Sequence, residues 1–161
     1  MRKRLQTLAA AAVLFAQALP AEILSGRVVA VVDGDTVRIL TADQTEERVR
    51  LATIDAPERG QPYGTVSRQN LADALHLQSV DVDWSKRDRW GRIVGRVLID
   101  GRDAGLIQIR AGLAWHYTAY ADEQSATDRA IYAEGESQAR AAESGLWSDP
   151  DPIPPWEWRR K

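Results

Sequence analysis

The alternation of apolar and polar residues predicts three β-strands near the start of the chain. Residues 27–32 form an apolar, β-branched run, which is followed by Asp33-Gly34 and by a second run over 36–40. An Asp-Gly pair between two such runs is typical of a β-hairpin. A third strand is expected over 47–54, where apolar residues alternate with arginines. The pattern therefore begins with a hairpin and one more strand.

The rest of the pattern alternates between helices and strands. Two further strands are expected over 80–84 and 93–99, on either side of a polar loop at 85–91. Apolar spacing and capping residues predict three helices: 65–77, Asp103 to Gly112, and Ser125 to about Glu143. Five strands with interposed helices indicate an α+β, mainly β, domain. We expect a five-stranded OB-fold barrel with about three α-helices packed on it.

Two terminal segments differ in composition from this domain, which we place at 22–148. Residues 149–161 are rich in proline and tryptophan, so we expect an extended C-terminal tail rather than a helix or a central strand. Residues 1–21 are mostly apolar and alanine-rich after a positively charged start. That arrangement is typical of a secretory signal peptide.

The predicted signal peptide has consequences for location. Small residues would allow cleavage after Ala18 or Ala21. The apolar stretch over 8–19 is shorter than the roughly 20 residues that span a bilayer, which favours a cleaved signal over a membrane anchor. We therefore expect an exported protein, in the periplasm or the medium, with no membrane attachment after cleavage.

Composition excludes some chemistry. The chain has no cysteine, so disulfides, thiol catalysis and cysteine-ligated zinc are impossible. Only two histidines are present, His76 and His116, which argues against a histidine-based nuclease or zinc site. Removing Arg2, Lys3 and Arg4 with the signal takes away three positive charges and no negative ones, which changes the formal charge from −2 to −5. A nucleic-acid partner would therefore need local basic groups or a bound cation.

A small set of charged residues suggests a specific reaction. Asp35, Asp55 and Glu58 supply three carboxylates, which suit a hard cation and the activation of a water molecule. Arg50 and Arg92 supply two guanidinium groups, which bind phosphate through paired hydrogen bonds. Together these groups are suited to cutting a phosphodiester.

Short segments spread over about 120 residues carry a family resemblance. They are Val32–Val37, Val49–Leu51, Ile54–Glu58, Pro62–Gly64, Trp90–Arg92, Ala111–Ala114 and Gly145–Trp147. Because all of these segments occur in this order, the chain resembles the staphylococcal nuclease (thermonuclease) family. The resemblance implies an OB-fold of five strands and three helices. It also implies calcium-dependent cleavage of DNA and RNA that leaves 3′-phosphates.

The resemblance assigns roles to the charged residues. Asp35 and Asp55 resemble the two carboxylate ligands of calcium, and Ala56 resembles the residue whose backbone carbonyl also binds the ion. The family often has threonine there, but a carbonyl ligand does not depend on the side chain. Two carboxylates alone would also suit magnesium or manganese.

The catalytic roles follow in the same way. Glu58 resembles the residue that activates or orients the attacking water, and Arg50 and Arg92 resemble the phosphate-clamping arginines. The three carboxylates and these two arginines carry a summed charge of −1, which a divalent cation changes to +1. The site should therefore repel a phosphodiester when empty and attract one when loaded.

Aromatic and basic residues nearby predict substrate contacts. Trp90 can stack on a base, and Arg89 can approach a phosphate. The resemblance implies that Tyr117 and Tyr120 stack on a nucleotide, since the family has aromatic residues in this region. Stacking requires unpaired bases, so we expect single-stranded or frayed DNA and RNA as partners. We expect a monomer with no stable protein partner.

The sequence leaves one competing function class open, a non-catalytic nucleic-acid-binding OB-fold module. Domains of that kind tend to lack the arginines, the glutamate or the carboxylate ligands, and this chain has all of them. The prediction is therefore an exported calcium-dependent nuclease. We assign Trp84, Trp115 and Trp147 to packing, and Trp156 and Trp158 to docking of the tail.

Overall fold

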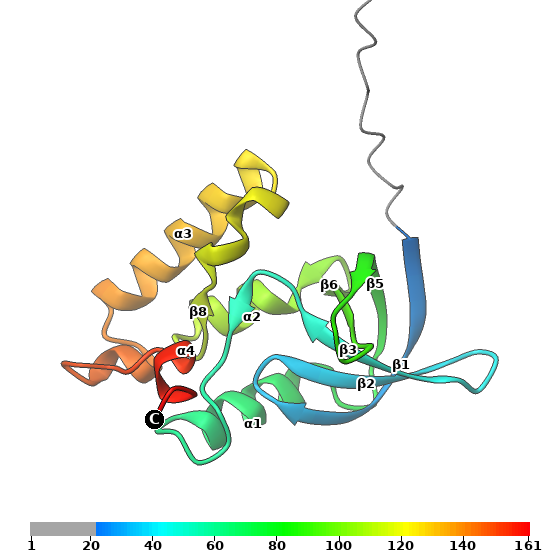
Figure 1. Ribbon diagram of the computed structural model, residues 1–161, viewed down its shortest axis with the longest axis horizontal. Coiled ribbons are helices and arrows are strands. Elements are labelled where there is room, and N and C mark those ends of the chain that lie inside the picture. Colours follow the sequence, from blue (N-terminus) through cyan, green and yellow to red (C-terminus); the bar gives the residue numbers. More distant parts are fainter. Residues whose placement is uncertain (1–21) are drawn as a thin grey trace, which may run out of the picture.

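Five strands close into a barrel in the computed structural model, which describes residues 22–161. The signal peptide predicted for residues 1–21 lies outside the described residues. The barrel strands are β1 (Glu22–Asp33), β2 (Thr36–Thr41), β3 (Glu46–Leu51), β5 (Ser79–Arg87) and β6 (Ile93–Ile99). Antiparallel pairing runs in the order β3-β2-β1-β5-β6, and a parallel pairing of β6 with β3 closes the sheet (Figure 1). The predicted five-stranded, mainly β, barrel is confirmed.

The closing pair of strands matters for the site. Arg50 of β3 pairs with Val94 of β6, two residues beyond Arg92. Residues that are distant in sequence are thus brought to one face by the closure. A closed sheet also leaves no free strand edge along this seam.

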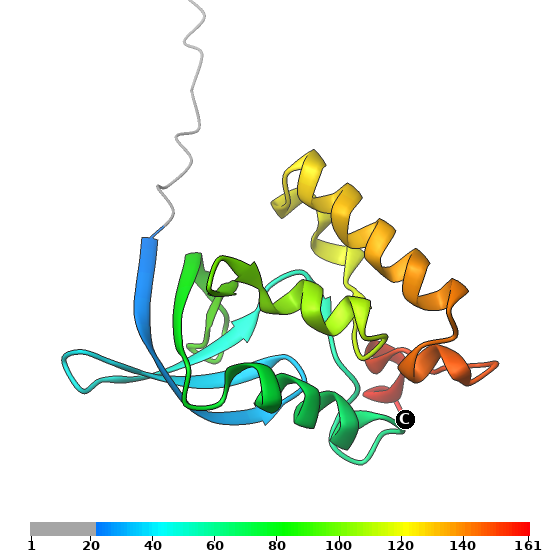
Figure 2. The same cartoon turned by 180° about the vertical axis from the view of Figure 1, so that it is seen from behind.

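Three helices pack beside the barrel, as predicted: α1 (Gly64–Leu75), α2 (Ala104–Arg110) and α3 (Ala126–Ala141). Figure 2 shows them stacked along one side of the molecule. The capping predictions hold, because Asp103 accepts hydrogen bonds from the N–H groups of Gly105 and Leu106, and Ser125 accepts one from Asp128. Each cap satisfies amide groups that the helix itself leaves unpaired.

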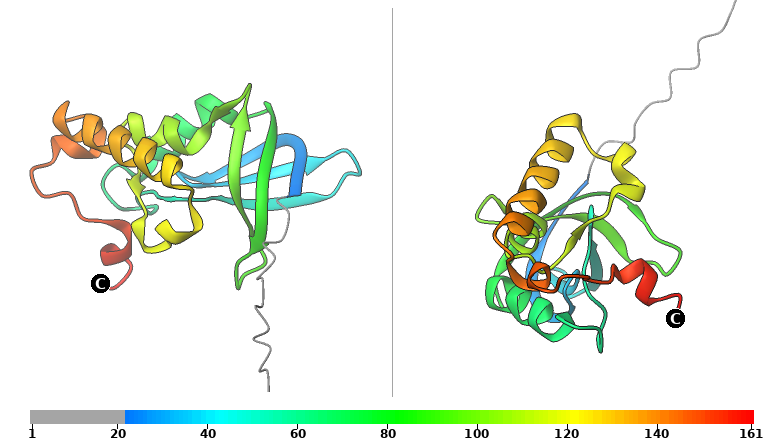
Figure 3. Two further views of the ribbon diagram at one scale, coloured as in Figure 1. Left: turned by 90° about the horizontal axis from the view of Figure 1, so that it is seen from above. Right: turned by 90° about the vertical axis from the view of Figure 1, so that its left-hand side faces the viewer.

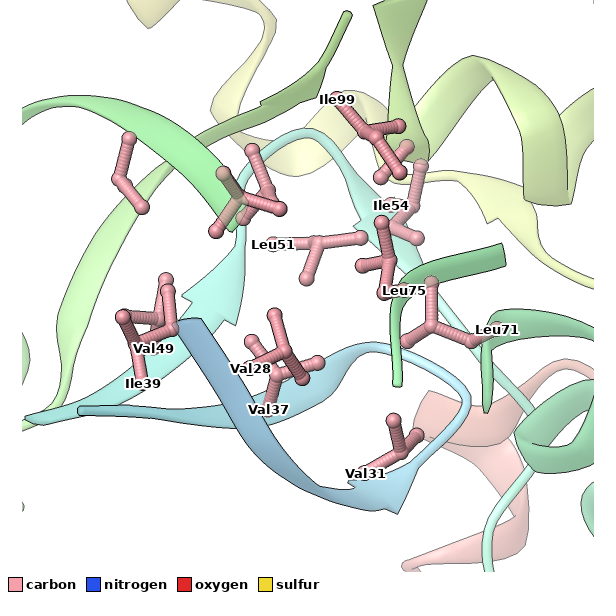
Figure 4. Close-up of a cluster of buried hydrophobic side chains, with 14 of the residues drawn as sticks. Val28, Val31, Val37, Ile39, Val49, Leu51, Ile54, Leu71, Leu75 and Ile99 are labelled. Carbon is pink, nitrogen blue, oxygen red and sulfur yellow. The ribbon is translucent and has the colours of Figure 1, made fainter. Parts of the chain in front are cut away.

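The core fills the barrel with branched aliphatic side chains. Its fully buried members come from the strands, α1 and α2, and Figure 4 labels several of them: Val28, Val37, Ile39, Val49, Leu51, Ile54, Leu71 and Leu75. The others include Val82, Ile93, Val97 and Ile109. Each such side chain contributes about 1.5–3 kcal/mol by leaving water. Arg48 and Arg50 lie on the other face of β3, so the same alternation that buries Val49 and Leu51 directs Arg50 outward.

The strand expected over 47–54 is interrupted, which corrects the prediction. β3 ends at Leu51, and Thr53 adopts a left-handed φ of 69° before the short strand β4 (Ile54–Asp55). The cause is tertiary, because Ala52 donates its N–H to Gly95 and the Thr53 carbonyl accepts from Tyr117. β4 then pairs with β8 (Trp115–His116), where Asp55 lies opposite Trp115.

The C-terminal tail is only partly extended, so that prediction also needs correction. After the 3₁₀ turn η2 (Gly145–Ser148), the chain is irregular up to Pro154 and then forms the single helical turn α4 (Pro155–Trp158). Proline is tolerated at the first position of a helix because its missing N–H is not needed there. Figure 3 shows the tail crossing from η2 to α4.

Tryptophan packing fixes the tail on the domain. Trp156 lies edge-on to Trp115, with ring centroids 5.6 Å apart, and Trp115 in turn contacts Trp147 at 4.3 Å. Trp158 contacts Lys161 within the tail itself. Trp156 therefore docks the tail as expected. Within residues 22–161, no helix has the length and apolar character needed to cross a membrane.

Candidate active site

A single groove brings the predicted site residues together. Its volume is about 1030 Å³, larger than the roughly 300–1,000 Å³ typical of small-molecule pockets. Its lining contains all ten predicted residues: Asp35, Arg50, Asp55, Ala56, Glu58, Arg89, Trp90, Arg92, Tyr117 and Tyr120. They come from the hairpin turn, β3, β4 and the loop after it, the β5–β6 turn, and the region of η1 (Thr118–Glu123).

The hairpin turn holds Asp35 in one position. Gly34 packs so closely that a Cβ atom there would lie 2.0 Å from the Ser67 Oγ and 2.7 Å from the Ala56 Cβ. Asp35 is buried, and its two oxygens accept hydrogen bonds from the Thr36 hydroxyl at 2.9 Å and from the Ala56 N–H at 3.1 Å. The Asp35 carboxylate and the Ala56 backbone are therefore locked side by side.

Asp35 and Asp55 face a common point. The Nη2 atom of Arg50 lies 3.5 Å from Asp35 Oδ2 and 3.2 Å from Asp55 Oδ1. Asp55 is only 1% exposed, so its charge needs a partner of opposite sign. The two buried carboxylates thus share one positively charged group, the guanidinium of Arg50.

Burial and crowding of like charges raise pKa values at this point. The pKa of Asp33, beside the hairpin turn, rises to about 6 because of burial and of the charge on Asp35. Burial also raises the pKa of Asp55, although hydrogen bonds from Arg159 oppose the rise and the charge on Asp35 adds to it. Both pKa shifts come mainly from the loss of water around the carboxyl groups, and the negative charge of Asp35 adds a smaller part.

The donor set fits an oxygen-binding cation. Among residues 22–161, no three His, Cys, Asp or Glu side chains are arranged to hold one ion. A cation here would therefore be held by two carboxylates, with the remaining ligands coming from backbone carbonyl, water or phosphate oxygens. Calcium and magnesium accept such sets, whereas zinc prefers nitrogen and sulfur.

Arg92 is held by a residue that the sequence analysis did not assign. The Oδ2 atom of Asp88 accepts a hydrogen bond from Arg92 Nε at 2.6 Å, and its Oδ1 atom accepts from the N–H groups of Trp90 and Arg92. These bonds shape the β5–β6 turn, in which Gly91 has a φ of 80°. The Asp-x-x-Gly pattern at 88–91 is a common turn signature and could have identified Asp88.

A second unassigned residue is Arg159, just after α4. Its guanidinium donates to both oxygens of Asp55, at 3.1 and 2.8 Å, and to Glu58 Oε1 at 2.6 Å. These hydrogen bonds raise the pKa of Arg159 further above its ordinary value. Asp55 and Arg159 are 104 residues apart. No local sequence pattern links positions so distant.

The predicted substrate residues lie along the groove but not all in one cluster. Trp90 is 66% exposed, with the guanidinium groups of Arg89 and Arg92 at 4.1 and 5.2 Å from its ring centre. Tyr117 and Tyr120 contact each other at 5.4 Å. The groove thus has one exposed aromatic near the phosphate-binding arginines and an aromatic pair elsewhere in its lining.

Residues excluded from the chemistry lie in structural surroundings. His116 is buried, with its Nε2 atom 2.9 Å from Gln124 Oε1, and His76 is exposed at the end of α1. Trp115 and Trp147 are buried against each other, as the packing prediction requires. Trp84 packs on the core and also borders the groove.

Comparison with known proteins gives a consistent result. A family model described as staphylococcal nuclease homologue matches residues 48–149, which include every predicted site residue except Asp35. A protein of Escherichia coli named an uncharacterized endonuclease is 41% identical over 86% of each chain. A Shigella flexneri protein named micrococcal nuclease is 41% identical over 97% of this chain and 92% of its own. A staphylococcal-like nuclease of Arabidopsis thaliana is 37% identical over 70% of this chain and 33% of its own.

Proposed function

Because the chain belongs to the staphylococcal nuclease family, we propose that it is a metal-dependent endonuclease that hydrolyses phosphodiester bonds in DNA and RNA. Family membership and the names of the similar proteins support nuclease activity. The observation that carries the proposal is the position of the Arg50 guanidinium between Asp35 and Asp55, in the groove that Glu58 and Arg92 also line.

Calcium is the proposed cation. Asp35, Asp55 and the backbone carbonyl of Ala56 would hold it, and the ion would supply polarisation of the phosphate. The two carboxylates already lie within 3.5 Å of one positively charged nitrogen, so little rearrangement is needed for them to share a cation. Magnesium or manganese could take the same oxygen ligands, so the assay below compares the three ions.

The chain's own residues would carry the chemical step. A water oxygen forms a bond to phosphorus, and Glu58 accepts the proton that the water loses. The bond from phosphorus to the 5′ oxygen breaks, and the departing oxygen takes a proton from solvent, which leaves a 5′-hydroxyl and a 3′-phosphate. Arg50 and Arg92 stabilise the negative charge that grows on the phosphate oxygens.

The groove also supports a preference for unpaired nucleotides. Trp90 presents its ring to solvent beside Arg89, and stacking of a base on such a ring is worth roughly 1–3 kcal/mol. Bases can stack in this way only when they are out of a duplex. The proposed substrates are therefore single-stranded or frayed regions, and the enzyme would act as a monomer.

Export remains part of the proposal. The expected mature N-terminus lies between Leu19 and Glu22, which mass spectrometry of the exported protein would detect. Recovery of the protein in membranes with Met1 intact would reject the cleaved signal.

The activity test uses purified protein with end-labelled single-stranded DNA and RNA. Cleavage is expected with calcium and should stop when a chelator is added, and parallel reactions with magnesium and manganese identify the preferred ion. Binding of the oligonucleotides without cleavage under every ion would instead identify a non-catalytic nucleic-acid-binding module. If the protein neither binds nor cleaves the oligonucleotides, nucleic acid is rejected as its partner.

A further inference from the structure

The C-terminal tail places a third arginine in the groove. Arg159 donates two hydrogen bonds to the Asp55 carboxylate and a shorter one to Glu58. Asp55 is proposed to hold the cation, and Glu58 is proposed to accept the proton from water. A single side chain from the far end of the sequence therefore contacts both groups on which the reaction would depend. The family match ends at residue 149, ten residues before Arg159.

The tail is anchored along its length, so this contact is not that of a loose surface arginine. Tyr63 and Ser148 share a hydrogen bond of 2.7 Å just before the tail begins, and Gln61 donates to the Ile153 carbonyl at 2.6 Å within the tail. Trp156 packs on Trp115 only three residues before Arg159. These anchors limit the positions that the Arg159 backbone can take.

We propose that Arg159 is a further functional residue of this site, which occupies Asp55 and Glu58 when no cation is bound and contacts the substrate phosphate when one is. The inference rests on the proposed nuclease function. An arginine and a divalent cation both require the oxygens of Asp55, so the two compete for this carboxylate. When the cation prevails, the guanidinium is released in the groove, where a phosphodiester is the strongest available partner.

The charge of the site changes when Arg159 is included. The three carboxylates with Arg50 and Arg92 sum to −1, and Arg159 brings the total to 0. A divalent cation would then raise it to +2 rather than +1. Arg159 should therefore weaken binding of the cation and strengthen binding of the phosphodiester. The two effects have opposite signs, which a purely structural role for the tail would not produce.

The test measures calcium affinity by isothermal titration calorimetry, without any turnover. Arg159→Ala should bind calcium more tightly than the wild type, by roughly 3- to 30-fold, the range expected for removing a partly exposed competing charge. Arg159→Lys keeps the charge but loses the planar fork, so its calcium affinity should lie between the two. The matched control is Arg160→Ala, which removes the same charge from the next residue, outside the groove lining.

A second titration uses a nucleoside 3′,5′-bisphosphate, which has phosphates but no phosphodiester to cleave. At saturating calcium, Arg159→Ala should bind this ligand at least about 3-fold more weakly, and Arg160→Ala should match the wild type. The inference is overturned if Arg159→Ala leaves calcium affinity unchanged, or if it lowers the affinity for calcium and the affinity for the bisphosphate together. It is also overturned if Arg160→Ala reproduces both shifts, since a general charge effect would then explain them.

Failure of this inference can be told apart from failure of the proposed function. A wild type that cleaves nucleic acid with calcium, together with unaltered affinities in Arg159→Ala, rejects only the role of Arg159. A wild type that neither binds calcium nor cleaves nucleic acid rejects the proposed nuclease function itself.

Discussion

Replacing Asp88 by asparagine should reduce turnover while leaving the fold intact. An asparagine can keep the Oδ1 acceptor that the backbone N–H groups of Trp90 and Arg92 use. Its NH₂ group would replace Oδ2 and present a donor to the Nε–H of Arg92, which is also a donor. The substitution therefore removes the 2.6 Å ion-paired hydrogen bond while the β5–β6 turn survives.

The size of the effect follows from the contact that is lost. Both side chains are more than four-fifths buried, with 18% of Arg92 and 16% of Asp88 exposed, so solvent screens the pair little. A hydrogen bond between charged groups contributes about 1.5–3 kcal/mol, and each 1.4 kcal/mol is a factor of ten in rate. If Arg92 stabilises charge that grows in the transition state, kcat should fall by about 10- to 100-fold, with KM changed less than about 3-fold.

The assay is steady-state cleavage of a short single-stranded oligonucleotide at saturating cation. Asp81→Asn is the matched control, since Asp81 lies on β5, the strand that leads into the turn with Asp88, but outside the groove lining. In an Asp88→Asn background, Arg92→Ala should cost less than in the wild type because the two residues act as a unit. A folded Asp88→Asn enzyme with wild-type kcat would refute the reasoning that Asp88 positions Arg92.

The same contact gives a pH prediction. Burial alone would raise the pKa of Asp88, but hydrogen bonds from the Arg92 side chain and from two backbone N–H groups outweigh it and lower the pKa below its ordinary 3.8. A depressed pKa stabilises the fold above the unfolded-state value, and this contribution is lost as pH falls through the folded-state pKa. The destabilisation caused by Asp88→Asn should therefore be largest near neutrality and fade in urea titrations as the pH falls below the ordinary pKa of 3.8. A destabilisation of equal size at both pH values would contradict the ion pair.

Two further substitutions test other parts of the site. Glu58→Gln removes the proposed base, so steady-state kinetics should show kcat lower by roughly 100-fold or more and substrate affinity equal or higher. A folded variant with near wild-type kcat would exclude Glu58 as the base. Gly34→Ala would place a methyl group 2.0 Å from the Ser67 Oγ, so its unfolding free energy in urea should fall by about 1–3 kcal/mol. Unchanged stability there would show that the hairpin turn can move away from α1.

The local parts of the fold were predictable because they depend on neighbouring residues. The Asp33-Gly34 hairpin and the caps at Asp103 and Ser125 are each decided within a few positions. The break after Leu51 was not predictable, since it depends on hydrogen bonds from Ala52 to Gly95 and from Tyr117 to Thr53. Sequence periodicity does not report pairings across such separations.

The candidate site divides in the same way. Resemblance predicted the groove residues from Asp35 to Tyr120, because the family's segments occur in order. The tail was assigned no helix because of its prolines, yet Pro154 and Pro155 are compatible with one helical turn that begins at Pro155. Docking through Trp156 was predicted, but its partner Trp115, and hence the position of Arg159, follows from tertiary packing alone. Such contacts leave no signal in a single sequence.

The central claim is that the carboxylates and the arginines form one site, in which a cation and a phosphate assist each other. When Arg159 is counted, the charge of the site rises from 0 to +2 on binding of a divalent cation. Bound cation should therefore strengthen phosphate binding, and bound phosphate should strengthen cation binding. By linkage, each ligand must raise the affinity of the other by the same factor.

The most direct measurement is a calorimetric calcium titration of the wild type, with and without a nucleoside 3′,5′-bisphosphate. We expect calcium affinity to rise at least about 5-fold when the nucleotide is present, a typical coupling of 1 kcal/mol or more. The increase should vanish in Asp35→Ala. Equal calcium affinities with and without the nucleotide in the wild type would contradict the account.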